Sequence, residues 1–186
     1  VYEEEFDCRD GFRWSPDGKS IAYWQIDARK IRNFLMINNT DSIYSYNIPV
    51  EYPKVGQDPS ACKIGVVDIA TAQTKWLNVP GSQVQNYIPR MDWVPNSNNI
   101  ILQQLNRAQN VSTVYLANAS TNTINEIYKE TDKVWVDAID KFHWINNNKE
   151  FVILTEKDNW AHLYRINIDN KKATLITNSN FDVMSL

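Results

Sequence analysis

Three consecutive carboxylates, Glu3, Glu4 and Glu5, lie near the start of the chain in the stretch VYEEEF. Neighbouring like charges repel each other, so such a run either faces solvent or holds a cation. An ammonium group donates charge-assisted hydrogen bonds to carboxylates, and these are among the stronger hydrogen bonds in proteins. Two interpretations are therefore open: a solvated acidic loop, or a binding site for a positively charged group.

The rest of the chain offers few groups for catalysis. Its two histidines, His143 and His162, each lie within a β-rich pattern, which favours structural roles. The Gly-x-Ser-x-Gly motif, which carries the nucleophile of α/β-hydrolases, is absent. Cys8 and Cys62 have no metal-ligand spacing, and two separate thiols are favoured over a disulfide, which stays open. We expect no catalytic residue, metal or cofactor in this chain, which should be inactive alone.

The composition favours strands and argues against a nucleic-acid partner. The net charge is −3 over 186 residues, and no basic stripe is present. Aromatic residues, which favour strands, make up 12% of the chain. No apolar run reaches the roughly 18 residues that a membrane span needs. Because the chain begins with neither Met nor a signal peptide, we expect it to be an internal piece of a longer protein.

A repeat runs through the sequence. Each copy has a Trp in a β-rich run, then a polar turn, then a second apolar run, and the three tryptophans are Trp14, Trp93 and Trp144. A further pair of β-rich runs follows in every copy, so each unit reads as four strands. Four-stranded units with a recurring Trp are typical of β-propeller blades. The sequence therefore predicts an all-β fold, an arc of about three four-stranded propeller blades.

The spacing of the repeat suggests how the chain is divided. The first unit is longer than the others and carries an insertion, 28–61, between its second and third strands. The expected segments are the end of a preceding blade with the acidic run (1–10), three blades (11–80, 87–130 and 138–180) and the start of a next blade (181–186).

Several motifs together resemble the propeller domain of the dipeptidyl peptidase IV family, in its bacterial form. They are VYEEEF followed by RDGFRWSPDGKSIAYWQ, then EYPKVG (Glu51–Gly56), and EKDNWAHLY (Glu156–Tyr164) within the longer matching stretch Trp135–Tyr164. They occur in the family's order, and the likeness covers essentially the whole chain.

The resemblance implies a fold and a function. Members are serine exopeptidases that release N-terminal dipeptides, usually after proline or alanine, and an eight-bladed propeller caps their α/β-hydrolase domain. By this likeness Glu4 and Glu5 bind the substrate's free α-amino group, and the C-terminal hydrolase domain of the same polypeptide supplies the triad. The likeness also implies that the arm 28–61 contacts a second subunit in a homodimer, and a flexible surface loop is the other interpretation of this insertion. The resemblance also implies an extracytoplasmic location: periplasmic, secreted or anchored through a segment absent here.

The acidic pair raises a geometric requirement. Neighbouring side chains of a regular strand point to opposite faces, so Glu4 and Glu5 could not reach one ammonium from a strand. We therefore predict an irregular backbone over Glu3–Phe6, as a bulge or a single helical turn. Glu3 is the carboxylate least expected to contact substrate.

The chain departs from the family pattern in one place. Animal members place an Arg-Phe-Arg segment after the Trp-Val that matches Trp135-Val136, whereas here DAIDKF follows. An arginine contact to the substrate carbonyl therefore does not carry over to this segment. Two other functions stay open: a non-catalytic protein-interaction propeller, and a tripeptidyl or other aminopeptidase of the same clan.

Overall fold

The computed structural model describes residues 2–186 and is built from strands alone. Within these residues there are fourteen strands and no helix, in three four-stranded antiparallel sheets and one two-stranded hairpin. The first sheet contains β1 (Phe12–Trp14), β2 (Ser20–Asp27), β5 (Ala61–Asp68) and β6 (Thr74–Trp76). The second contains β7 (Asn86–Trp93), β8 (Asn99–Asn106), β9 (Val111–Asn118) and β10 (Ile124–Thr131). The third contains β11 (His143–Ile145), β12 (Glu150–Thr155), β13 (His162–Asn167) and β14 (Ala173–Leu175).

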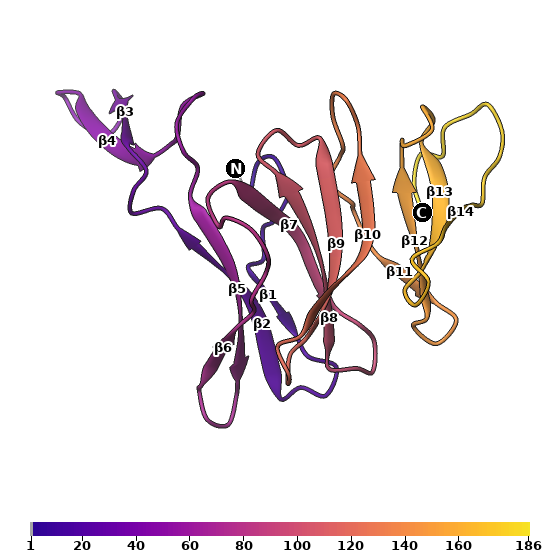
Figure 1. Cartoon of the computed structure of the whole chain (residues 1–186). Coiled ribbons are helices and arrows are strands. Elements are labelled where there is room, and N and C mark those ends of the chain that lie inside the picture. Colours follow the sequence, from indigo (N-terminus) through magenta and orange to yellow (C-terminus); the bar gives the residue numbers. More distant parts are fainter. Residues whose placement is uncertain (1) are drawn as a thin grey trace.

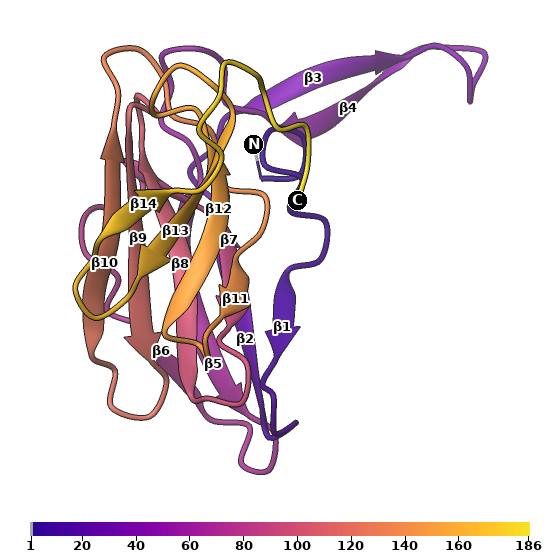
Figure 2. The same cartoon turned by 90° about the vertical axis from the view of Figure 1, so that its right-hand side faces the viewer.

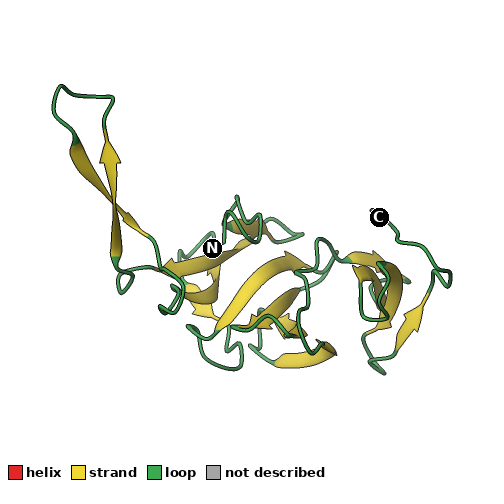
Figure 3. Ribbon diagram, turned by 90° about the horizontal axis from the view of Figure 1, so that it is seen from above, coloured by secondary structure: helices red, strands yellow, loops and turns green. Residues whose placement is uncertain are grey.

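The sheets follow one another along the chain as consecutive blades of an arc (Figure 1). Each sheet keeps its strands in sequence order, and each repeated tryptophan lies in the first strand of its sheet. The predicted fold class, an all-β arc of three four-stranded propeller blades, is confirmed. The remaining strands, β3 (Asn33–Asn38) and β4 (Tyr46–Glu51), form a hairpin inserted between β2 and β5. Viewed from above, this hairpin extends away from the three sheets (Figure 3).

The turns use residues that tolerate a left-handed backbone. Gly18, in the β1–β2 turn, has a φ of 69°, which glycine adopts without steric cost. Three consecutive residues between β11 and β12, Asn146, Asn147 and Asn148, have φ values of 50°, 52° and 64°. Asparagine enters this region more readily than most residues because its short polar side chain bonds locally. A chain with only five glycines thus makes many of its reversals with asparagine.

Apolar side chains fill the spaces between successive sheets. One core cluster joins the first and second sheets, and it includes Trp24, Ile64, Leu102 and Leu105. A second cluster joins the second and third sheets through residues such as Phe151 and Ile153. Indole groups tie the first two sheets together, since Trp93 Nε1 donates to Arg13 O at 3.0 Å and Trp24 Nε1 donates to Ile88 O at 2.8 Å.

Substituting Gly65 by alanine is expected to destabilise the first sheet. A Cβ at this position would lie 2.8 Å from the Tyr23 ring and 2.9 Å from the Trp76 ring. The two rings pack edge to face with centroids 5.7 Å apart, so the added methyl group would have to displace one ring from the other. Overpacking of this kind costs about 1–3 kcal/mol. Urea denaturation measures the change, and Gly11→Ala, where nothing lies within 4 Å, is the matched control.

Candidate functional site

The acidic run forms a turn. Residues 2–6 adopt turn geometry and no strand, so the predicted irregular backbone over Glu3–Phe6 is confirmed. Tyr2 and Phe6 are buried, with 8% and 3% of their surfaces exposed, whereas the three glutamates between them are exposed. The backbone N–H of Cys8 donates to Tyr2 O at 2.9 Å and closes the segment. Two buried aromatic residues thus flank three carboxylates that face outward.

The turn packs on the second sheet, although it precedes the first in sequence. The rings of Tyr2 and Phe6 lie 6.4 and 5.4 Å from the ring of Tyr87, which is in β7. The regular pairing of β7 with β8 is interrupted between Tyr87 and Arg90. This irregularity leaves Ile88 N–H free to donate to the Tyr2 hydroxyl at 3.2 Å. The burial that surrounds this hydroxyl raises the pKa of Tyr2.

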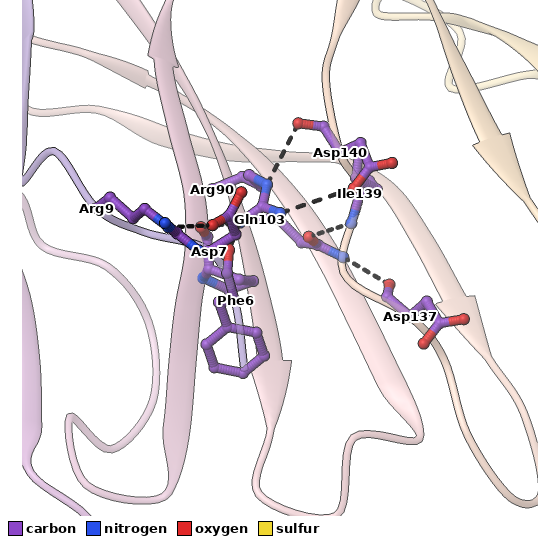
Figure 4. A network of polar contacts seen from close by, with 9 residues as sticks. Phe6, Asp7, Arg9, Arg90, Gln103, Asp137, Ile139 and Asp140 are labelled. Carbon is purple, nitrogen blue, oxygen red and sulfur yellow. Dashed lines mark hydrogen bonds and ion pairs between the residues drawn. The ribbon is translucent and has the colours of Figure 1, made fainter. Parts of the chain in front are cut away.

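Arg90 connects the turn to a distant loop (Figure 4). Its Nη1 donates to Phe6 O, and also to Pro89 O at 2.9 Å. Its Nε donates to Asp140 O at 3.3 Å, while Nη2 lies 3.8 Å from the Asp140 carboxylate. The loop that carries Asp140 is the segment that follows Trp135-Val136.

Gln103 fixes the same loop to the second sheet. Its side chain is fully buried in β8, and Nε2 donates to Ser112 Oγ at 2.9 Å and Asp137 O at 3.3 Å. Its Oε1 accepts a 2.8 Å hydrogen bond from Ile139 N–H. Neither Gln103 nor Arg90 was singled out from the sequence. The available signals were a glutamine within the apolar run IILQQL and an arginine directly after a proline in a strand.

A cavity of about 570 Å³ lies beside the turn and is lined by Glu5 but not by Glu4. Tyr87 and Arg107 also line it. The remaining lining residues come from the segment after β4: Tyr52, Pro53, Lys54, Val55, Gln57 and Pro59. Arg107 is held in place by bonds to Gln57 O at 2.6 Å and to the Tyr87 hydroxyl at 3.2 Å. The two predicted site residues therefore share an exposed turn, but only Glu5 faces this cavity.

The Glu4 carboxyl is stabilised in its ionised form. A hydrogen bond from its own backbone N–H is the main cause that lowers the pKa of the Glu4 carboxyl, which stays ionised at neutral pH. The turn and the segment after β4 lie at the same end of the sheets (Figure 2). The cavity is thus lined by one carboxylate, that of Glu5, and by the guanidinium of Arg107.

Comparisons with known proteins place the chain in a family. Residues 1–186 match the family model described as the dipeptidyl peptidase IV (DPP IV) N-terminal region. The chain belongs to this family. Dipeptidyl peptidase 4 of Sus scrofa is 24% identical over 216 residues, which cover 100% of this chain and 27% of the relative. Inactive dipeptidyl peptidase 10 of Mus musculus is 29% identical over 140 residues, covering 73% of this chain and 17% of the relative.

A solved structure agrees with the sequence match. The crystal structure of Porphyromonas gingivalis dipeptidyl peptidase 4 superimposes with a TM-score of 0.89 at 27% identity, over 99% of this chain and 26% of that one. The chain thus spans about a sixth to a quarter of the length of these relatives. The resemblance recognised from its motifs, to the N-terminal propeller domain of the dipeptidyl peptidase IV family, is confirmed.

Both cysteines and one histidine of this DPP IV N-terminal region are at least partly buried. Cys8 and Cys62 are both free thiols, and burial raises the pKa of Cys62 to about 12. Across residues 2–186 no group of three or more His, Cys, Asp or Glu side chains could hold a metal ion. No helix that could cross a membrane occurs in that same range. His162 is buried, and its ring nitrogens contact Asp158 at 2.9 Å and Ser179 O at 2.8 Å.

The pair of His162 and Asp158 predicts a pH-dependent stability of this DPP IV domain. The hydrogen bond with Asp158 is the main cause that raises the pKa of His162 above its ordinary value, near 6.5. Burial raises the pKa of Asp158, but its hydrogen bonds, with that from His162 foremost, outweigh burial and lower it. The stabilisation is therefore fully present below about pH 6.5 and is lost as the pH rises through the raised value.

The test compares unfolding free energies of wild type and His162→Gln between pH 5.5 and 9. The difference between them should be largest at pH 5.5 and should shrink at alkaline pH. Asp158→Asn, which removes the partner, should abolish this trend. A difference that is constant over the whole range would contradict the prediction.

Proposed function

We propose that this chain is part of the substrate-gating propeller domain of a serine exopeptidase that releases N-terminal X-Pro or X-Ala dipeptides. Glu4 and Glu5 bind the α-ammonium of the incoming peptide. The C-terminal α/β-hydrolase domain of the same polypeptide supplies the catalytic triad, and the whole protein acts outside the cytoplasm. The observation that carries the proposal is the outward-facing acidic turn on a buried aromatic base, with Glu5 at the rim of a cavity.

The physical basis is the charge of a peptide N-terminus. Its ammonium has a pKa of about 7.7–8.0 and three N–H donors, which match two carboxylates. When the pair is at a fixed distance from the nucleophile, it measures the two residues to be released. An internal peptide segment has no ammonium and would leave both carboxylates without a partner, so it is rejected.

The test uses the full-length protein and a chromogenic Gly-Pro amide. Cleavage should require the free amine, so the N-acetylated reporter should not be hydrolysed. Alanine variants of Glu4 and Glu5 should both lose activity toward the free amine. Rates within about twofold of wild type, a change below about 0.4 kcal/mol, would show that the acidic pair does not bind substrate.

A non-catalytic interaction propeller is the second candidate. It is favoured by the mouse relative, whose name describes it as inactive. A full-length protein without the hydrolase nucleophile would support this alternative. A related tripeptidyl or other aminopeptidase would still need the ammonium contacts, but it would release a product of a different length from an unblocked peptide.

We also infer that the hairpin β3–β4 docks on a second subunit of a homodimer. Its large apolar side chains are exposed in this chain, with exposed fractions of 56% for Leu35, 51% for Met36 and 67% for Ile37. Replacing these three residues by serine in the full-length protein should convert a dimer into a monomer, as measured by light scattering. A dimer that persists in the triple variant would exclude this interface.

A further inference from the structure

The backbone of the acidic turn is fixed by few contacts. Cys8 N–H bonds Tyr2 O inside the segment, and Ile88 N–H bonds the Tyr2 hydroxyl. At the other end of the turn, Phe6 O accepts from the guanidinium of Arg90. Phe6 directly follows Glu5, so this contact fixes the backbone on the C-terminal side of the three carboxylates.

Arg90 itself has little freedom. Its side chain is only 20% exposed, and three backbone carbonyls accept from it: those of Phe6, Pro89 and Asp140. The carboxylate of Asp140 is 92% exposed and lies 3.8 Å away, so it is a weak partner. The planar guanidinium thus donates to backbone carbonyls of two distant segments at once. The compact ammonium of a lysine does not reproduce this geometry.

Arg90 and its contacts with Phe6 O and Asp140 O form a clamp between the acidic turn and the loop 137–140. The loop is also held in position from its other side. Gln103 is fully buried and bonds Asp137 O and Ile139 N–H, on the loop that carries Asp140. A continuous series of contacts therefore runs from β8, through the loop 137–140 and Arg90, to Phe6 (Figure 4).

We propose that Arg90 is a positioning residue that ties the acidic turn to the loop 137–140 and thereby sets the affinity for the substrate's amino group. The inference rests on the proposed function and extends it to a residue that does not touch substrate. Arg90 acts through Phe6 O, so its loss displaces Glu4 and Glu5 without removing their charge.

The experiment examines Arg90→Met in the full-length protein with two measurements. Methionine is similar in length but has no hydrogen-bond donors. Hydrogen–deuterium exchange of the peptide 2–10 should become about tenfold faster, because the turn opens more often. For the free-amine Gly-Pro reporter, KM should rise about tenfold while kcat changes little. This pattern indicates binding energy that is lost equally from the ground state and the transition state.

Matched variants separate positioning from a general loss of stability. Arg165→Met removes a partly exposed arginine of the third sheet, which pairs with Glu150, and should change neither measurement. Asp140→Asn keeps the carbonyl acceptor and should stay within about twofold of wild type. Arg90→Lys keeps one donor and the charge and should lie between wild type and Arg90→Met. It also serves as the test variant if Arg90→Met fails to fold.

Two outcomes would overturn the inference. Exchange of the turn at the wild-type rate in both Arg90 variants would show that Arg90 does not position it. Faster exchange with unchanged KM, in a protein whose Glu5 variant is impaired, would show that the clamp has no effect on substrate binding. If the Glu4 and Glu5 variants are themselves fully active, the proposed function fails instead, and the exchange rates alone decide whether the clamp exists.

Discussion

Glu5→Gln in the full-length protein should lower kcat/KM for a free-amine dipeptidyl reporter by about 30-fold. Glutamine keeps the size of the side chain but removes the charge that would meet the ammonium. Truncating one partner of a buried hydrogen-bonded charge pair, the state proposed for Glu5 once a peptide is bound, costs about 2 kcal/mol at the lower end of its range, and each 1.36 kcal/mol is a factor of ten. The same change is expected for Glu4→Gln. The double variant should lose more than either single variant.

Glu3→Gln is the matched control for this prediction. It removes the same charge from the same exposed turn, but Glu3 has no assigned contact with substrate. Its kcat/KM should stay within about twofold of wild type. Equal losses for all three variants would indicate a general effect of negative charge rather than a specific pair.

The pH dependence gives an independent check of the same contact. A substrate ammonium loses its proton as the pH rises through about 7.7–8.0, so kcat/KM should fall above that range. The fall should be steeper in wild type than in the double glutamine variant, because that variant no longer distinguishes the charged amine from the neutral one. A wild-type profile that is flat up to pH 9.5 would argue against recognition of a charged amine.

Phe6→Ala is expected to reduce the unfolding free energy of the 186-residue chain by about 3 kcal/mol or more. Phe6 is 3% exposed, and its ring lies against those of Tyr2 and Tyr87, with centroids 5.8 and 5.4 Å away. Truncating a buried phenylalanine loses the transfer free energy of the ring and leaves a cavity behind. Urea denaturation measures the change.

Phe12→Ala is the control for Phe6→Ala because it removes the same ring from a position that is 47% exposed. It should cost less than about 1 kcal/mol. A similarly small effect of both substitutions would mean that the turn does not pack on the second sheet as described. Phe6→Leu, which keeps most of the apolar volume, should lie between Phe6→Ala and wild type.

Local pattern was enough to predict the sheets. The tryptophans at 14, 93 and 144 and the polar turns after them predicted the first strand of each blade, because hairpins are defined by residues close in sequence. The irregular turn at Glu3–Phe6 followed from a geometric argument about strand pleat, and the structure agrees.

Contacts between distant segments could not be predicted in this way. The bond from Arg90 to Phe6 joins residues 84 positions apart, and that from Ile88 to Tyr2 joins residues 86 apart. No periodicity encodes such pairs, since they depend on how one blade packs on the next. The same limit applies to the cavity beside Glu5, which Arg107 lines together with the segment after β4.

The position of the acidic turn has a consequence for the order of folding. Its aromatic base rests on β7, so the whole first sheet and its inserted hairpin lie between the two partners in sequence. Contacts of such long sequence separation pay a large loop-closure entropy and form slowly. During synthesis the glutamates would leave the ribosome before β7 and would acquire their final orientation only after the roughly ninety residues that follow them had also emerged.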